Sequence, residues 1–152
     1  YVMERLDLAE ATGRFEAGTV LSGEIVGHDE TFKTSRVSVG EQVLDMPRAP
    51  MAVGTGVRLR VRARDVALAT TRPSGISIRN ILGARVIQIV EEPDTAFAEV
   101  LVDIGAQRLR ARITRAAVAD LGLAEGGAVF ALVKSVAFDR RVLGDDSAAT
   151  RT

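Results

Sequence analysis

The strongest constraint on this chain is a strict alternation of apolar and charged residues over short stretches. Residues 57–64 read Val-Arg-Leu-Arg-Val-Arg-Ala-Arg, which places four apolar side chains on one face and four arginines on the other. Residues 108–113 repeat the pattern as Arg-Leu-Arg-Ala-Arg-Ile. A period of two residues is typical of a β-strand with one buried and one solvated face. The chain is therefore expected to be mainly β.

Other stretches that are rich in aliphatic residues end at turn-forming residues and are also expected to be strands. They are residues 19–27, 35–40, 81–91, 96–104 and 128–138. One helix is expected where Thr114 can cap an alanine-rich segment that ends at Gly122. Short strands at this spacing favour small barrels over alternating βαβ units.

The two halves of the chain repeat one another. The segment 53–68 aligns with 123–138 at an offset of 70, whereas upstream 25–26 aligns with 86–87 at an offset of 61 and 37–40 with 102–105 at an offset of 65. The simplest interpretation is two OB-like five-stranded β-barrel modules. They would span residues 19–70 and 76–139, with the helix in the second. Residues 1–18 are expected to be a connector, and residues 144–152 a disordered tail.

Composition excludes several classes of function. Twenty basic and twenty acidic side chains cancel, so the chain has no overall field to attract nucleic acid or a membrane. Aromatic residues make up 4%, too few for a platform on which bases stack. Cysteine is absent and the single histidine, His28, cannot build a metal site alone, so neither a metal nor another cofactor is expected.

Targeting signals are also missing from the sequence. The apolar runs all fall short of the roughly 20 residues that span a bilayer, and the chain does not open with a signal peptide. No direct membrane insertion is therefore expected. Because the first residue is Tyr1 rather than methionine, the chain is expected to be a piece of a longer protein.

Side chains that suit a compact dianion occur together only in the second copy. They are Ser77, Arg79, Asn80, Thr114, Lys134 and Ser135. Charge-assisted hydrogen bonds from arginine and lysine, with neutral hydroxyl donors, are the usual means of holding such an anion. Histidine, cysteine or paired carboxylates are not placed to move a proton. The sequence therefore predicts anion binding and no enzymatic activity.

Each of these residues also has an ordinary structural interpretation. Ser77 and Asn80 suit a turn between two barrels, Arg79 suits a surface ion pair and Thr114 suits a helix cap. The Lys-Ser pair alone is a polar pair on a strand. Their order and spacing together favour the anion site.

The first copy offers a weaker case for a site of its own. Asp65 aligns with Ser135 and would repel an anion, so a second site is not expected there. The arginines of residues 58–64 are interpreted as a solvated strand face, or as a face that meets acidic groups of a partner, rather than as a nucleic-acid surface.

Residues 76–86, Ile-Ser-Ile-Arg-Asn-Ile-Leu-Gly-Ala-Arg-Val, resemble the Ser-Ala-Arg-Asn-x-Leu-x-Gly-x-Val opening of the molybdate/tungstate-binding (molbindin, or Mop-type) domain. The later residues Thr114, Leu121-Gly-Leu123, Gly126 and Val133-Lys134-Ser135 are similar to the rest of that domain. The first copy, with the preceding residues 8–18, resembles the C-terminal half of a molybdate-importer ATPase subunit. The chain thus looks like the tandem Mop/TOBE regulatory region of an ABC importer's ATP-binding subunit. The resemblance implies that both barrels are of the molbindin/TOBE type and that residues 1–18 connect them to an upstream ATPase domain.

The resemblance implies a homodimer with oxyanion sites at its subunit interfaces, which take molybdate or tungstate. Carried over by position, the oxyanion-binding residues are Ser77, Arg79, Thr114, Lys134 and Ser135, and Asn80 belongs to the same motif. One departure is Ala117, where relatives often carry serine. That change puts the strength of the site in question.

The resemblance also implies a function in regulation. The domain would sense intracellular molybdate and inhibit transport by binding it at the dimer interface. It would be cytoplasmic and peripheral to the inner membrane, held there by the importer's permease subunits. The chain lacks a Walker A segment, so it is not expected to hydrolyse ATP by itself. The alternatives are a ligand-free dimerisation module of an importer ATPase and a molbindin-type molybdate storage protein.

Overall fold

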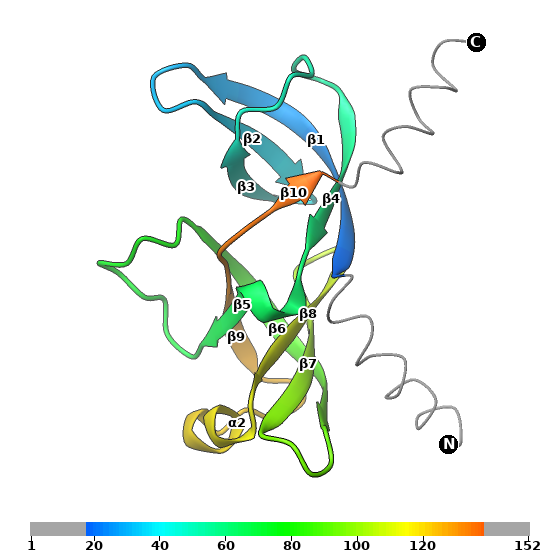
Figure 1. The fold of residues 1–152 in the computed structure, drawn as a ribbon, viewed down its shortest axis with the longest axis vertical. Coiled ribbons are helices and arrows are strands. Elements are labelled where there is room, and N and C mark those ends of the chain that lie inside the picture. Colours follow the sequence, from blue (N-terminus) through cyan, green and yellow to red (C-terminus); the bar gives the residue numbers. More distant parts are fainter. Residues whose placement is uncertain (1–17, 139–152) are drawn as a thin grey trace, which may run out of the picture.

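The computed structural model describes residues 18–138, which form a mainly β structure of two curled five-stranded sheets with one helix (Figure 1). The expected fold class is therefore confirmed. Apart from Gly18, the segments expected as a connector and as a tail lie outside the described residues. Within the described residues, no helix has the length and apolarity needed to cross a membrane.

The first sheet has the strand order β10-β4-β1-β2-β3. Its strands are β1 (Thr19–Asp29), β2 (Thr34–Val39), β3 (Gln42–Pro47), β4 (Gly56–Val61) and β10 (Ala137–Phe138). The second sheet has the order β5-β9-β6-β7-β8. Its strands are β5 (Val66–Ala69), β6 (Asn80–Glu91), β7 (Phe97–Asp103), β8 (Arg108–Thr114) and β9 (Ala128–Val133).

The two copies exchange their last strands. β5 follows the first copy in sequence but pairs with β9 of the second sheet, where Val66 lies opposite Val133. β10 ends the second copy but pairs with β4 of the first sheet, where Ala137 lies opposite Arg60. Figure 1 shows the orange β10 among the strands of the first sheet and the green β5 among those of the second. The sheets therefore divide the chain differently from the two sequence copies.

This exchange explains why one expected strand was wrong. Residues 128–138 form two strands in different sheets, because the chain leaves β9 at Val133 and crosses to the first sheet before β10 begins. The expected strand over residues 57–64 also ends early, at Val61. Ala63–Asp65 then form a 3₁₀ turn, η1, on the way to β5.

Hydrogen bonds confirm the repeat and correct its alignment. β1 and β6 carry matching irregularities after Ile25 and Val86, in agreement with the offset of 61. Gly54 N–H donates to the Ile25 carbonyl, and Gly126 N–H donates to the Val86 carbonyl, both at 2.7 Å. These equivalent bonds make the offset between β4 and β9 equal to 72 (126 − 54) rather than 70.

The offset of 70 applies only to the exchanged strands. Leu68 of β5 lies opposite Ala131, and Phe138 of β10 lies opposite Leu59. Leu59 and Ala131 are equivalent residues of β4 and β9, because they too differ by the offset of 72 (131 − 59). Leu68 and Phe138 therefore occupy equivalent places. The segment that contains η1 makes this connection slightly longer in the first copy than in the second.

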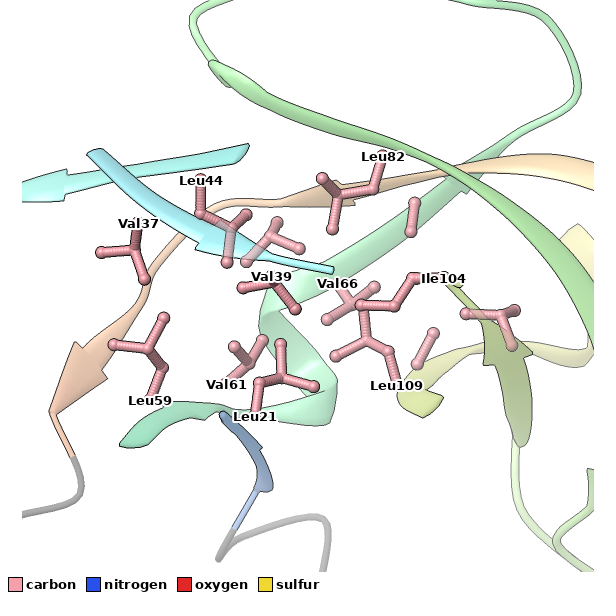
Figure 2. Packing of buried hydrophobic residues seen from close by; sticks show 14 of the residues in the cluster. Leu21, Val37, Val39, Leu44, Leu59, Val61, Val66, Leu82, Ile104 and Leu109 are labelled. Carbon is pink, nitrogen blue, oxygen red and sulfur yellow. The ribbon is translucent and has the colours of Figure 1, made fainter. Parts of the chain in front are cut away.

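The predicted alternation places one face of each strand in a shared core. Val57, Leu59 and Val61 of β4 are buried, whereas Arg58 and Arg62 are exposed. One apolar cluster runs through both sheets, and Figure 2 shows Leu21, Val61, Val66 and Leu109 from four different strands converging in it. The two modules thus share a single hydrophobic core.

Two glutamine side chains join the sheets at their edges. Gln42 donates from Nε2 to the Gly83 carbonyl and accepts at Oε1 from Gly83 N–H, both at 2.9 Å. Gln107 makes the same pair of bonds with the peptide groups of Ser22, both at 2.8 Å. The offset of 65 relates Gln42 to Gln107, so each copy makes this contact with the other. The contacts satisfy peptide groups of β1 and β6 that precede the stretches paired with β2 and β7.

The expected helix is confirmed as α2, which spans Arg115–Leu121. Thr114 caps it by accepting a hydrogen bond from Ala117 N–H at Oγ1, 3.1 Å away. Gly122 ends it with φ of 61°, in the left-handed region where glycine is favoured.

Candidate anion-binding site

Strand pairing brings two separated cations to one end of the second sheet. Asn80, the first residue of β6, lies opposite Val133, the last residue of β9. Arg79 and Lys134 each lie one position beyond that pair, so both follow the same end of the sheet although they are far apart in sequence. Both are exposed. An anion that approaches this end of the sheet meets two positive charges.

Two of the predicted hydroxyls belong to the same end. Ser77 precedes Arg79 by two positions, in the segment of residues 70–79 that joins β5 to β6. Ser135 follows Lys134 on the crossing from β9 to β10. Both serines are exposed. We refer to Ser77, Arg79, Lys134 and Ser135 as the cationic end of the second sheet.

Thr114 does not lie at the cationic end. It pairs with Phe97 at the start of β7, and the next residue of β7, Ala98, pairs with Glu91 at the opposite end of β6 from Asn80. Figure 1 likewise shows α2 at the far end of the second sheet from the crossing between β9 and β10. Within one chain, Thr114 and Lys134 therefore cannot contact the same small anion.

The hydroxyl of Thr114 keeps a donor while it caps the helix. Its oxygen accepts from Ala117 N–H, and a threonine hydroxyl has one proton and two acceptor sites. The proton can still be donated to an anion from the exposed side chain. Beside it, Arg115 forms an ion pair with Glu91 at 3.4 Å, so the charge near the helix start is partly balanced.

Asn80 has a different environment from the other predicted residues. It is 7% exposed, and its side chain is hydrogen bonded to the backbone of Asp45 in the first sheet. The amide therefore has little surface from which to contact an anion in solvent.

Asp65 lies beside the second sheet, although it belongs to the first sequence copy. Because β5 belongs to the second sheet, the carbonyl of Asp65 accepts a hydrogen bond from Lys134 N–H at 2.9 Å. The half-buried Asp65 is thus a neighbour of the cationic end rather than of a separate site in the first copy. Its carboxylate lowers the positive potential that an anion meets there.

A cavity of about 650 Å³ lies elsewhere, between turns of the two sheets. It is lined by residues 40–42, 83–85 and 103–106, and the six predicted site residues are not among them. The only sequence signal for it is the pair Gly40 and Gly105, which the repeat aligns and which both have positive φ.

Comparison with known proteins identifies the second copy. Residues 76–138 match the family model of the TOBE domain. The second copy is a TOBE domain. The TOBE domain is a non-catalytic binding domain, in agreement with the expectation that this chain is not itself an enzyme.

The whole chain is similar to part of longer proteins. It is 41% identical over 143 residues to the molybdenum import ATP-binding protein ModC of Mesorhizobium japonicum, an alignment that covers 94% of this chain and 38% of that protein. The ModC protein of Brucella abortus is 41% identical over 135 residues, covering 89% of this chain and 36% of the relative. The chain thus spans less than two fifths of these relatives, in their C-terminal part.

A solved structure has a fold similar to that of most of this chain. The cytoplasmic molybdate-binding protein ModG, with molybdate bound, superposes with a TM-score of 0.68 at 27% sequence identity. The match covers 79% of this chain and 94% of that one.

Proposed function

We propose that this chain is the cytoplasmic oxyanion-binding regulatory region of the ATP-binding subunit of a molybdate or tungstate importer. The observation that supports the proposal is the pairing of β6 with β9, in which the residues next to Arg79 and Lys134 lie opposite one another at one end of the TOBE domain, where both cations are exposed. The names of the ModC relatives and of ModG support molybdate as the ligand.

The cationic end supplies the chemistry that such a ligand needs. Molybdate and tungstate are tetrahedral dianions, so two cations neutralise the charge and hydroxyl donors set the geometry. Arg79 and Lys134 supply the charge, and Ser77 and Ser135 supply neutral donors. Asn80 belongs to the same motif.

A partner subunit completes the site. Thr114 is at the far end of the second sheet from Lys134, so it reaches the anion only if it comes from a partner subunit. The ligand then lies at the interface of a homodimer, with the cationic end of one subunit facing the helix start of the other. The position of Thr114 thus supports a dimer-interface site.

Binding at an interface provides a means of regulation. An anion that contacts both subunits favours the arrangement in which they face one another, and the equilibrium shifts by the difference in affinity between the two arrangements. In the full protein, rising cytoplasmic molybdate would hold the ATPase subunits in an inactive arrangement. Transport through the membrane permease subunits would then fall.

Calorimetric titration of this chain with molybdate, using sulfate as the control anion, tests binding. We expect saturation near one anion per chain with molybdate and no saturation with sulfate. Arg79→Ala should weaken binding at least tenfold, whereas Arg58→Ala, which removes an exposed arginine from the first sheet, should leave it unchanged. An absence of heat in a dimeric sample would contradict the proposal and favour a ligand-free dimerisation module.

The regulatory part is tested in the complete transporter. ATPase activity should fall as molybdate is added, and Arg79→Ala should abolish that response without changing activity in the absence of molybdate. A transporter with Arg79→Ala that is inhibited like the wild type would contradict the assignment of the site.

A further inference from the structure

We infer that Asn80 is a positioning residue, which fixes the cationic end of the TOBE domain to the first sheet, and that it does not contact the anion. The inference rests on the function proposed above and assigns a role within that site. It concerns a residue that the motif alone would place among the ligands.

The side-chain amide of Asn80 is matched to one peptide segment of the first sheet. Asp45 N–H donates to Asn80 Oδ1 at 2.7 Å, and Asn80 Nδ2 donates to the Asp45 carbonyl at 2.9 Å. The orientation of the amide is fixed by chemistry, because an N–H donor must face the oxygen and a carbonyl must face the nitrogen. Both functional groups of the amide are therefore engaged.

The contact is made at an edge that would otherwise be open. Asp45 lies in β3, whose neighbour in the first sheet is β2 alone. Asn80 pairs with the other edge of β3 as a residue of an adjacent strand would. It thereby joins β3 to the first residue of β6.

The equivalent contact in the other copy is simpler. Thr19 is the equivalent of Asn80 at the offset of 61, and Arg110 is the equivalent of Asp45 at the offset of 65. Thr19 Oγ1 accepts from Arg110 N–H at 3.3 Å. This single, longer bond occurs in the copy where Gly18 stands in the place of Arg79. The two-point contact thus occurs in the copy that carries the predicted ligands.

The position of Asn80 explains what the contact does. Residues 70–79 run from β5 to β6 outside helices and strands, and Asn80 is the first residue after them that is both paired in the sheet and buried. The peptide bond before Asn80 links it directly to Arg79. Fixing Asn80 therefore limits where Arg79 can place its guanidinium relative to Lys134.

The test separates a positioning role from direct contact by changing the other side of the bond. Molybdate affinity is measured by calorimetry for Asn80→Ala and for Asp45→Pro. The proline removes the N–H that donates a hydrogen bond to Asn80 Oδ1. Proline is tolerated best on an edge strand such as β3. Two controls are Asp45→Ala, which keeps that N–H but loses the 3.8 Å ion pair with Arg36, and Gln107→Ala, which breaks a contact between the sheets away from the cationic end.

We expect Asn80→Ala and Asp45→Pro each to weaken binding about tenfold, and the double variant to be no weaker than either alone, because both break one contact. Both controls should stay within twofold of the wild type. Asn80→Thr, which copies Thr19, should recover part of the loss. Unchanged affinity in Asp45→Pro, with weak binding in Asn80→Ala, would overturn the inference and make Asn80 a ligand.

A readout without anion keeps this inference separate from the proposed function. Hydrogen–deuterium exchange of the peptide that contains residues 77–79 should be faster in Asn80→Ala than in the wild type, and unchanged in Gln107→Ala. A wild-type chain that does not bind molybdate would contradict the proposed function. Equal exchange in all three proteins would contradict the positioning role.

Discussion

The two modules have the same strand plan and differ at the places where function is proposed. In each module the first strand is long and has an irregularity at the equivalent position. In each, a glutamine side chain contacts the other module, and the last strand pairs in the other sheet. The TOBE domain adds Arg79 before its long strand and α2 before β9, whereas the first module has Gly18 at the position of Arg79. The difference shows that the shared plan serves folding, and that the proposed site rests on a few residues added to one copy.

The shared core predicts that equivalent substitutions in the two modules have equal and large effects. Leu21 and Leu82 are equivalent residues at 0% and 1% exposure. Replacing either with alanine should lower the free energy of unfolding by about 2–5 kcal/mol. Because one core and two exchanged strands join the modules, each variant should still unfold in a single transition in differential scanning calorimetry.

The control for this pair is Val20→Ala, which shortens a side chain that is 39% exposed on the same strand as Leu21. It should shift the transition far less. Two separate transitions, only one of which moves with each leucine variant, would show that the modules fold independently.

A smaller effect should distinguish the modules, at Gly23 and its equivalent Ala84. A Cβ added at Gly23 would lie 2.6 Å from Val37 Cγ1 and 2.7 Å from the Ser38 carbonyl oxygen, so β1 and β2 would have to separate. Gly23→Ala should therefore cost about 1–3 kcal/mol in chemical denaturation. Ala84→Gly should cost no more than about 1 kcal/mol, since it only removes a methyl group and adds backbone freedom.

Gly27→Ala is the matched control, because a Cβ there has open space around it. It should be nearly neutral. If Gly23→Ala proved as mild as Gly27→Ala, the close approach of β1 to β2 would not be a constraint on the first module.

The smallest effect concerns Asp65, a residue of the first module that lies next to Lys134. Asp65→Asn should tighten molybdate binding about twofold to fourfold, because it removes a negative charge near the dianion at an exposed site where water and salt screen the interaction. Glu24→Gln, which removes an exposed carboxylate from β1, should leave the affinity unchanged. Weaker binding in Asp65→Asn would show that this carboxylate supports the site instead of opposing the anion.

Alternation and capping were sufficient to predict much of the fold. The arginine rows of β4 and β8 and the cap of α2 are local signals, and the structure has them where the sequence indicates. β3 was missed, because it has only six residues, contains Asp45 and ends at Pro47, and aspartate and proline are both typical of turns. The exchange of β5 and β10 was also missed, since nothing in the residues of a strand says which of two similar sheets it will join.

The candidate site shows the same limit. The arrival of Arg79 and Lys134 at one end of the sheet follows from the pairing of two strands of one module. The distance of Thr114 from Lys134 follows from the order of β6, β7 and β8 within the second sheet, whereas the burial of Asn80 goes with its contact to the first sheet. A motif records which residues occur together, and it does not record which of them face the ligand.

The crossed connections have a consequence for dividing the chain. A cut within residues 70–79 leaves two polypeptides, and each retains the strand that completes the sheet of the other. Neither piece can complete its own sheet, because the strand that it lacks belongs to the other piece. Co-expressed as separate genes, the halves would have to associate as a heterodimer, and the covalent link in the single chain makes that association intramolecular and so raises the effective concentration of each half for the other.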